Sequence, residues 1–357
     1  PASPSPIPFD DLASSSSTAH SDFCERLHAH GFAVVRFSSA AATEVASLRE
    51  LAAGFFSLAP EDKTAIGDFR FVGDTYAGYR DSASIDAEFL EVHTTDTNGT
   101  YPPLAKPAGL SKAAAALHAR LDAMSRRMLV VLASHINVPA EALLAPLDPP
   151  RLSVAEPAPN GVGNGNGEDD NADLSSSCLR VCHYRRRPED NAPSIKPDDD
   201  DPQIEVLFDS HTDSSLLTLS TLCPGAPGLQ LHVGGEWLSI ESVDGVSEVD
   251  VEVHVGDFLC FLSRDYFPSC VHRVVRPLSG PGRLSFPFLV RPRSDHVLDT
   301  TKYDPQGTNP HLVEVSGIKC KELRKLFDVR GKRVREEEEE AEAKHKKLVE
   351  ERERERK

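Results

Sequence analysis

Short β-prone runs separated by turns fill residues 204 to 292, and this pattern limits the possible folds more than any other feature of the chain. Gly234-Gly235, between two of the runs, predicts a two-residue hairpin turn. Strands this short and this frequent favour an antiparallel barrel or a double-sheet jelly roll. The runs read "LLTLSTL", "GLQLHV", "EWLSI", "VDVEVHV", "FLCFL", "CVHRVV" and "LSFPFLV".

One strand and two long helices are predicted upstream of this β-rich region. "HGFAVVRF" at 30–37 has the branched apolar centre of a strand, whereas residues 40–58 carry apolar side chains at helical spacing. From Ser111 to Asn137 apolar residues recur at intervals of three and four, which predicts a long amphipathic helix packed against a sheet.

Three segments have compositions that do not favour a packed core. Residues 155–175 combine Gly, Asn and acids and residues 188–203 are rich in Pro and Asp, so both are expected to be disordered. Residues 330–357 are almost wholly charged, which predicts a solitary charged helix and a candidate contact for a protein partner. We divide the chain into an N-terminal α/β region (1–110), the long helix with a disordered insert (111–178), a jelly-roll core (179–300), a C-terminal helical segment (301–329) and the charged tail helix (330–357).

Charge and composition exclude several classes of partner. A formal net charge of −17 argues against a nucleic-acid-binding surface, which needs a basic patch. No stretch approaches the roughly 18–20 apolar residues that cross a bilayer, and residues 1–8 lack the basic and apolar regions of a secretory signal. The 7 cysteines form no CxxC pair, which suits free thiols in a reducing compartment. We therefore expect a cytoplasmic protein with no nucleic-acid or membrane partner, and "RGKRVR" at 330–335 leaves the nucleus as an alternative.

A histidine and an aspartate stand two positions apart in "FDSHTDSSLLTLS". In a strand, His211 and Asp213 would project from one face, and imidazole with carboxylate suits a divalent first-row metal. The third ligand must come from another strand. Because the chain has 14 histidines, His232 and His254 are alternatives, but His272 in "SCVHRVV" is the better candidate. The competing interpretation is three polar strand residues that pair locally.

A second polar pair follows His272 along the chain. Arg283 and Ser285 are again two positions apart, so a strand would place a guanidinium and a hydroxyl on one face. Such a pair can clamp a carboxylate, because arginine grips carboxylates bidentately. The competing interpretation of Arg283 is a structural salt bridge.

These residues, in this order, carry a family resemblance. His211-Thr212-Asp213, His272 and Arg283-Leu284-Ser285 resemble the HxD…H…RxS signature of the Fe(II)/2-oxoglutarate-dependent dioxygenases. The chain is most similar to their isopenicillin-N-synthase-like, plant-type branch. "LRVCHYRRRP", "HTDSSLLTL", "GLQLHVGGEW", "VGDFLCFLS" and "VHRVVRP" follow one another in that branch's order, and weaker matches extend upstream to "HGFAVV".

The resemblance implies a fold, a reaction and a set of site residues. The fold is mainly β with flanking helices, a double-stranded β-helix (jelly roll, cupin-like) packed by N-terminal helices. His211, Asp213 and His272 would bind Fe(II) and form the catalytic centre, and Arg283, Ser285 and Tyr184 would hold the co-substrate 2-oxoglutarate. With O2 as oxidant and ascorbate as reductant, a small molecule would be hydroxylated or desaturated while 2-oxoglutarate becomes succinate and CO2.

Three positions depart from the branch's pattern. Cys182 stands where an Asn is usual, Leu289 stands where an aromatic residue is common, and the arginines at 185–187 replace a Pro-rich run. Tyr79 and Phe89 are candidates for the substrate pocket, although aromatic residues in apolar segments usually belong to the core. Two alternatives stay open: an oxidase of the same fold that does not use 2-oxoglutarate, and a non-catalytic binding protein whose charged tail engages a partner.

Overall fold

The computed structural model describes residues 5–14, 17–66, 69–72, 75–95, 100–102, 104–150, 174–185, 204–277 and 282–327. The predicted disordered segments 155–175 and 188–203 lie outside these residues, apart from 174 and 175. The charged tail at 330–357, with its predicted helix, import signal and protein partner, also lies outside them.

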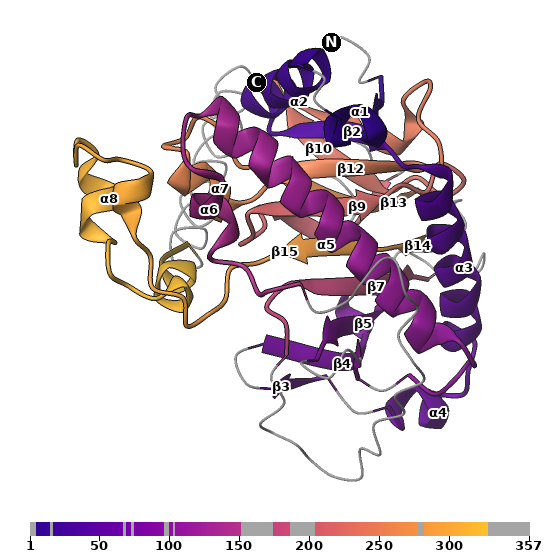
Figure 1. Cartoon of the computed structure of the whole chain (residues 1–357). Coiled ribbons are helices and arrows are strands. Elements are labelled where there is room, and N and C mark those ends of the chain that lie inside the picture. The colour runs from indigo at the N-terminus through magenta and orange to yellow at the C-terminus, as the bar shows by residue number, and fades with distance from the viewer. Residues whose placement is uncertain are drawn as a thin grey trace, which may run out of the picture.

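Two facing β-sheets form the centre of the protein (Figure 1). The larger sheet has 11 strands in the order β1-β2-β12-β9-β15-β7-β5-β4-β3, with β14 on β7 and β6 on β5, and the smaller has the order β11-β10-β13-β8. This agrees with the predicted β-rich core. The larger sheet comprises β1 (Ile7–Pro8), β2 (Phe32–Arg36), β3 (Arg70–Val72), β4 (Thr75–Ser82), β5 (Ala87–Thr94), β6 (Thr100–Tyr101), β7 (Cys178–Tyr184), β9 (Leu217–Thr221), β12 (Asp250–Val255), β14 (Arg283–Ser285) and β15 (Pro287–Val290); the smaller comprises β8 (Ile204–His211), β10 (Leu229–Val233), β11 (Glu236–Ser239) and β13 (His272–Pro277).

Helices cover one face of the larger sheet. The long helix α5 lies across it, and α3 packs beside α5 (Figure 1). Both occupy the predicted ranges to within two residues, because their apolar side chains recur at helical spacing and are buried. The helices are α1 (Phe9–Ala13), α2 (Ser17–His30), α3 (Ser39–Phe56), α4 (Pro60–Thr64), α5 (Leu110–His135), α6 (Ala140–Leu144), α7 (Asp257–Leu262) and α8 (Pro310–Glu314), with the 3-10 turns η1 (Ala83–Ile85), η2 (Ile240–Ser242) and η3 (Thr300–Lys302).

The central strands of the larger sheet divide their side chains between the helices and the interior of the barrel, as β12 shows. On β12, Val251, Val253 and Val255 belong to the apolar core under the helices. Glu252 and His254 alternate with them and therefore face the interior. The register continues this interior row across the sheet, because His254 is opposite Thr218 on β9.

The predicted division of the chain at residue 110 crosses this sheet. β5, from the predicted N-terminal region, pairs along its length with β7, from the predicted jelly-roll core. The domain boundaries drawn from the sequence stay a prediction.

Two predicted strands differ in the structure. The sequence predicts a strand for "FLCFL", but this run forms the helix α7, which begins after Gly256 with Asp257 in its first turn. A short, wholly apolar run has no periodicity to separate a buried strand from a buried helix. In addition, β8 ends at His211, so Asp213 lies in the following turn rather than on the same strand.

Two local predictions, the hairpin turn and the free thiols, are confirmed. Gly234 and Gly235 form the two-residue loop between β10 and β11, both with positive φ. All 7 cysteines are free thiols. No helix among the described residues is long and apolar enough to cross a membrane.

A buried ion pair fastens α4 to the helix-facing side of β5. Lys63 and Tyr79 both donate to Oε1 of Glu88, and Nδ1 of His183 lies 3.0 Å from its Oε2. Burial alone would raise the pKa of Glu88, but the hydrogen bonds from His183, Lys63 and Tyr79 lower this pKa to about 2. Glu88 therefore stabilises the fold as a carboxylate.

Replacing Glu88 with Gln should destabilise the protein in a pH-dependent way. A carboxyl group whose pKa is lower in the folded state than in the unfolded state stabilises the fold at pH values above the unfolded-state pKa. This contribution is lost as the pH falls towards the folded-state pKa. We expect Glu88→Gln to cost about 2–3 kcal/mol of unfolding free energy at neutral pH. The difference from wild type should shrink as the pH falls from 4.5 towards about 2.

Urea unfolding at a series of pH values measures this difference. Glu44→Gln is the control, because its ion pair with Arg120 is partly exposed and should contribute less than about 1 kcal/mol. Equal losses in both variants, or a loss at Glu88 that does not change with pH, would contradict the prediction.

Candidate metal centre

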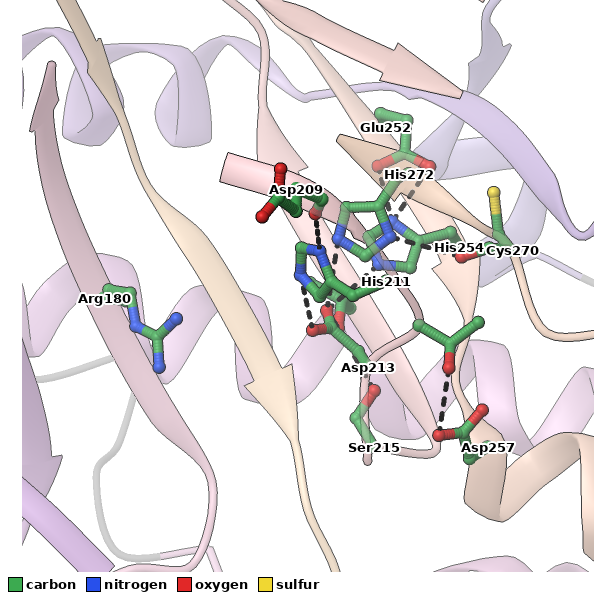
Figure 2. Close-up of polar contacts among 12 residues, drawn as sticks. Arg180, Asp209, His211, Asp213, Ser215, Glu252, His254, Asp257, Cys270 and His272 are labelled. Carbon is green, nitrogen blue, oxygen red and sulfur yellow. Dashed lines mark hydrogen bonds and ion pairs between the residues drawn. The ribbon is translucent and has the colours of Figure 1, made fainter. Parts of the chain in front are cut away.

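The pairing of β8 with β13 brings two distant histidines together. His272, at the start of β13, is directly opposite His211, at the end of β8. Their ring centroids lie 4.2 Å apart. Asp213, in the turn after β8, points between them, with Oδ1 at 3.8 Å from Nε2 of His211 and Oδ2 at 4.0 Å from Nε2 of His272. The three ligand atoms all lie within 4.8 Å of one another (Figure 2).

Backbone carbonyls orient both imidazole rings. Nδ1 of His211 donates to the carbonyl of Asp209 at 2.8 Å, and Nδ1 of His272 donates to the carbonyl of Cys270 at 3.2 Å. A carbonyl can only accept a hydrogen bond, so each Nδ1 carries a proton, and each Nε2 is the ring nitrogen turned toward Asp213. Burial, followed by the charge of His254, lowers the pKa of His272 to about 3 and keeps this ring neutral.

The turn that carries Asp213 is held against the start of α7. The carbonyl of Asp213 accepts hydrogen bonds from the amides of Ser215 and Asp257 at 2.9 and 2.8 Å. Gly256 packs directly on this turn: a Cβ there would overlap the carbonyl and hydroxyl oxygens of Ser215 and lie 2.7 Å from the carbonyl of Asp213. A glycine at 256 therefore lets the turn approach closely enough to place the carboxylate.

Two neighbours fix the Asp213 carboxylate through one oxygen. Thr218 donates its hydroxyl to Oδ2 at 2.6 Å, and Nε2 of His254 lies 3.1 Å from the same oxygen. Nδ1 of His254 lies 2.9 Å from Glu252, so the ring bridges two carboxylates. Burial opposes a charge on His254, but Glu252 and Asp213 outweigh it and raise the pKa of His254 to about 10. Oδ1 of Asp213 is thereby left facing His211.

This role of His254 is not predicted from the sequence, in which His254 is a weaker candidate for the third ligand or an ordinary strand residue. The one hint in the sequence is that His254 lies on a predicted strand two residues before Gly256-Asp257. Only the pairing of β12 with β9 shows that His254 lies beside Asp213. His232, the other alternative, is exposed and lies beside Trp237, with ring centroids 5.0 Å apart and the ring planes tilted by 55°.

The predicted clamp residues lie on the interior face of neighbouring strands. On β14, Arg283 is opposite Tyr184 and Ser285 is opposite Cys182 on β7. The guanidinium carbon of Arg283 lies 5.9 Å from the centroid of the Tyr184 ring. Arg283 is buried and bonded to Glu241, yet its Nη1 atom has no hydrogen-bond partner among the described residues. A buried guanidinium nitrogen without a partner is a position where a carboxylate fits.

The pocket candidates Tyr79 and Phe89 face opposite sides of the sheet. Phe89 meets Tyr184 edge to face at 6.1 Å and belongs to a small interior cluster with Cys182. Tyr79 instead belongs to the core under the helices and donates to Glu88. The structure therefore excludes Tyr79 from the interior, and Phe89 remains a candidate.

A second group of ligand-type side chains, Glu91, His93 and Cys178, is committed to other contacts. Both ring nitrogens of His93 contact backbone carbonyls, those of Ser175 at 2.7 Å and Tyr76 at 2.9 Å. Glu91 is paired with Arg180, whose Nε lies 2.8 Å away. Burial raises the pKa of Cys178 to about 11, so its thiol stays protonated. We assign no metal to this group.

Part of the chain resembles known oxygenases in sequence. Residues 175–292 match the model of the 2OG-Fe(II) oxygenase superfamily. Leucoanthocyanidin dioxygenase 1 of Oryza sativa subsp. japonica is 28% identical over 211 residues, which cover 58% of this chain and 47% of that protein. The 1-aminocyclopropane-1-carboxylate oxidase homolog 12 of Arabidopsis thaliana is 30% identical over 163 residues, covering 44% of this chain and 39% of that protein. The chain thus spans less than half the length of these curated relatives.

Solved structures share the whole fold. A full-length Neurospora crassa protein, solved in complex with alpha-KG and 5-formyluracil, superposes with a TM-score of 0.65 at 18% identity over 90% of this chain and 94% of that one. The dioxygenase for auxin oxidation in rice gives a TM-score of 0.60 at 15% identity over 92% and 95%. At these identities the likeness shows the fold alone, and it confirms the predicted double-stranded β-helix with N-terminal helices.

The two donors to Oδ2 of Asp213 should matter for metal affinity. We expect Thr218→Val, which removes one hydroxyl with little change of shape, and His254→Ala, which removes the second donor, each to weaken Co(II) or Mn(II) binding roughly 10- to 100-fold. Calorimetric titration of the full chain measures this, and exposed His232→Ala is the control. Unchanged affinity in both variants would show that Asp213 needs neither donor.

Gly256 should tolerate no side chain. We expect Gly256→Ala to cost about 1–3 kcal/mol or more, because the new methyl group meets backbone atoms that cannot move aside easily. Thermal unfolding followed by circular dichroism measures the loss. Gly225→Ala is the control, since nothing lies within 4 Å of a Cβ at that position. A wild-type melting temperature for Gly256→Ala would refute the close contact.

Proposed function

We propose that this chain, whose residues 175–292 match the model of the 2OG-Fe(II) oxygenase superfamily, is an Fe(II)- and 2-oxoglutarate-dependent dioxygenase that hydroxylates or desaturates a small-molecule metabolite. The observation that carries the proposal is the triad His211, Asp213 and His272, whose ligand atoms converge within 4.8 Å. Two imidazoles and one carboxylate on one side of a metal are the donor set of non-haem Fe(II) oxygenases, and they leave further positions open.

Iron bound here, with 2-oxoglutarate and O2, would supply the oxidising power, and 2-oxoglutarate would leave as succinate and CO2. The chain's own residues would hold the iron and orient the groups around it. The Nδ1–H groups of His211 and His272 are anchored on carbonyls, which would leave the Nε2 atom of each ring to bind the metal. Asp213 adds a negative charge, because its pKa is held well below the usual range: burial opposes this, but His254 and the neighbouring imidazoles outweigh burial.

The co-substrate's second carboxylate would bind at Arg283. The Nη1 atom of this arginine supports that role, because none of the residues that the structure describes bonds to it. Ser285 on the same strand face and Tyr184 on the paired strand also support it. Phe89 and Tyr184 place aromatic surface on the same interior face. Such surface would exclude water from the reacting groups and contact an organic substrate.

The three side chains of the triad are exposed to solvent to different extents. The side chain of His211 is 25% exposed, that of Asp213 14% and that of His272 8%. We infer that the substrate approaches from the side of His211, while His272 closes the inner side of the centre.

Succinate production tests the reaction. Purified full-length protein with Fe(II), ascorbate and 2-oxoglutarate should form succinate slowly even without a substrate. We expect His272→Ala and Asp213→Ala to reduce this at least about 100-fold, since each removes a ligand. His232→Ala, an exposed histidine on a strand adjacent to β13, should keep the wild-type rate.

Two observations favour a second candidate, an oxidase of the same fold that does not use 2-oxoglutarate. Two of the three guanidinium nitrogens of Arg283 are already engaged by Glu241, and Cys182 replaces the usual asparagine. Protein that binds iron at the triad but forms no succinate, and consumes O2 with ascorbate alone, would favour this second candidate over the first.

A further inference from the structure

Glu241 is a buried carboxylate at the centre of the 3-10 turn η2, and its side chain is 0% exposed. The sequence signature does not include it. Removing a carboxylate from water costs several kcal/mol unless charged and polar partners replace the solvent. Its partners therefore show what this residue does.

Both oxygens of Glu241 are fully engaged. Oε1 accepts from the amide of Cys223 at 2.8 Å, and Oε2 accepts from the amides of Gly228 and Leu229 at 2.7 and 3.0 Å. Arg283 completes the set, with Nη2 at 2.7 Å from Oε1 and Nε at 3.3 Å from Oε2. The carboxylate thus joins the connection between β9 and β10 to one edge of the guanidinium.

The guanidinium of Arg283 is also confined sterically. Gly228 packs against it so closely that a Cβ would lie 2.8 Å from Cδ and 3.0 Å from Nε of Arg283. A guanidinium is planar and has two edges that can each receive a carboxylate, the Nε/Nη2 edge and the Nη1/Nη2 edge. Glu241 holds the first edge. The Nη1 atom, on the second edge, is buried and has no hydrogen-bond partner in the described part of the chain.

We propose that Glu241 is a positioning residue for the co-substrate: it holds Arg283 by the Nε/Nη2 edge and presents the Nη1 edge to the distal carboxylate of 2-oxoglutarate. The proposal rests on the proposed function. Because three backbone amides share the negative charge of Glu241, the arginine keeps part of its attraction for a second anion. Recognition then depends on the direction of the Nη1 donors, and a freely rotating arginine would lose this direction.

Binding selectivity tests the proposal without relying on turnover. The full chain, loaded with Mn(II) in the absence of O2, is titrated calorimetrically with 2-oxoglutarate and with 2-oxopentanoate, which has a methyl group in place of the distal carboxylate. Wild-type protein should prefer 2-oxoglutarate. We expect Glu241→Ala to weaken 2-oxoglutarate binding roughly tenfold or more, to leave 2-oxopentanoate and Mn(II) binding unchanged, and so to remove most of the preference.

Glu241→Gln is the second variant, because it keeps the shape of the side chain if the alanine variant does not fold; it should reduce the preference in the same direction. The matched control is Glu205→Gln, which neutralises another fully buried carboxylate paired with a buried arginine, Arg276, at 2.9 Å. This control should lose stability while keeping the wild-type preference.

The outcomes separate the two proposals. Wild-type protein with no preference for 2-oxoglutarate would refute the proposed function and this inference with it. A wild-type preference that persists in the Glu241 variants would refute the inference alone. Tighter 2-oxoglutarate binding in Glu241→Ala would also overturn it, because Glu241 would then compete with the co-substrate for Arg283.

Discussion

The antiparallel pairing of β8 with β13 is the contact on which the candidate centre depends. It joins the end of one strand to the beginning of another that starts 61 residues later in the chain, as His211 and His272 are opposite each other. A register shifted by one residue would turn one of the two side chains to the other face of the sheet. The turn that follows β8 supplies the carboxylate of Asp213. Because this turn packs closely against Gly256, Asp213 lies beside the imidazole rings of His211 and His272.

The interior of the barrel holds its charged groups in pairs. Glu91 pairs with Arg180, Glu241 with Arg283, and Glu252 with His254, and each of these carboxylates lies on or beside the interior face of the larger sheet. Breaking a buried pair leaves an uncompensated charge, which is strongly destabilising. The pairs therefore keep their side chains in single orientations, as the proposed binding of a metal and an anion requires. The Glu252–His254 pair contacts Asp213 through Oδ2, and Glu241 contacts Arg283 through Nε and Nη2. These contacts leave Oδ1 of Asp213 and Nη1 of Arg283 for the proposed ligands.

The helix-facing side of the same sheet forms the main apolar core. Its alternate residues are almost entirely apolar and pack under α3 and α5, with the Lys63–Glu88 pair as an exception at one end. This closely packed apolar layer supports the strands on their helix-facing side. The polar side chains on the interior face therefore project from a well-supported backbone. Leu289 illustrates the division: its neighbours Phe288 and Val290 belong to the helix-facing core, while Leu289 is opposite Thr218 and Cys178 on the interior face.

The sequence by itself determined the β-rich core, the long helices α3 and α5, the hairpin at Gly234-Gly235, and the residue types and order of the ligand and clamp residues. These follow from local periodicity, turn chemistry and a signature that is read along the chain. Only the tertiary structure decided that "FLCFL" is the helix α7, that Tyr79 faces the helices while Phe89 faces the interior, and that His254 bonds Asp213. It also decided that Glu241 holds Arg283, across 42 residues of sequence. The physical reason is that strand register and sheet pairing join residues far apart in the chain, and no local pattern of side chains encodes which of them will meet.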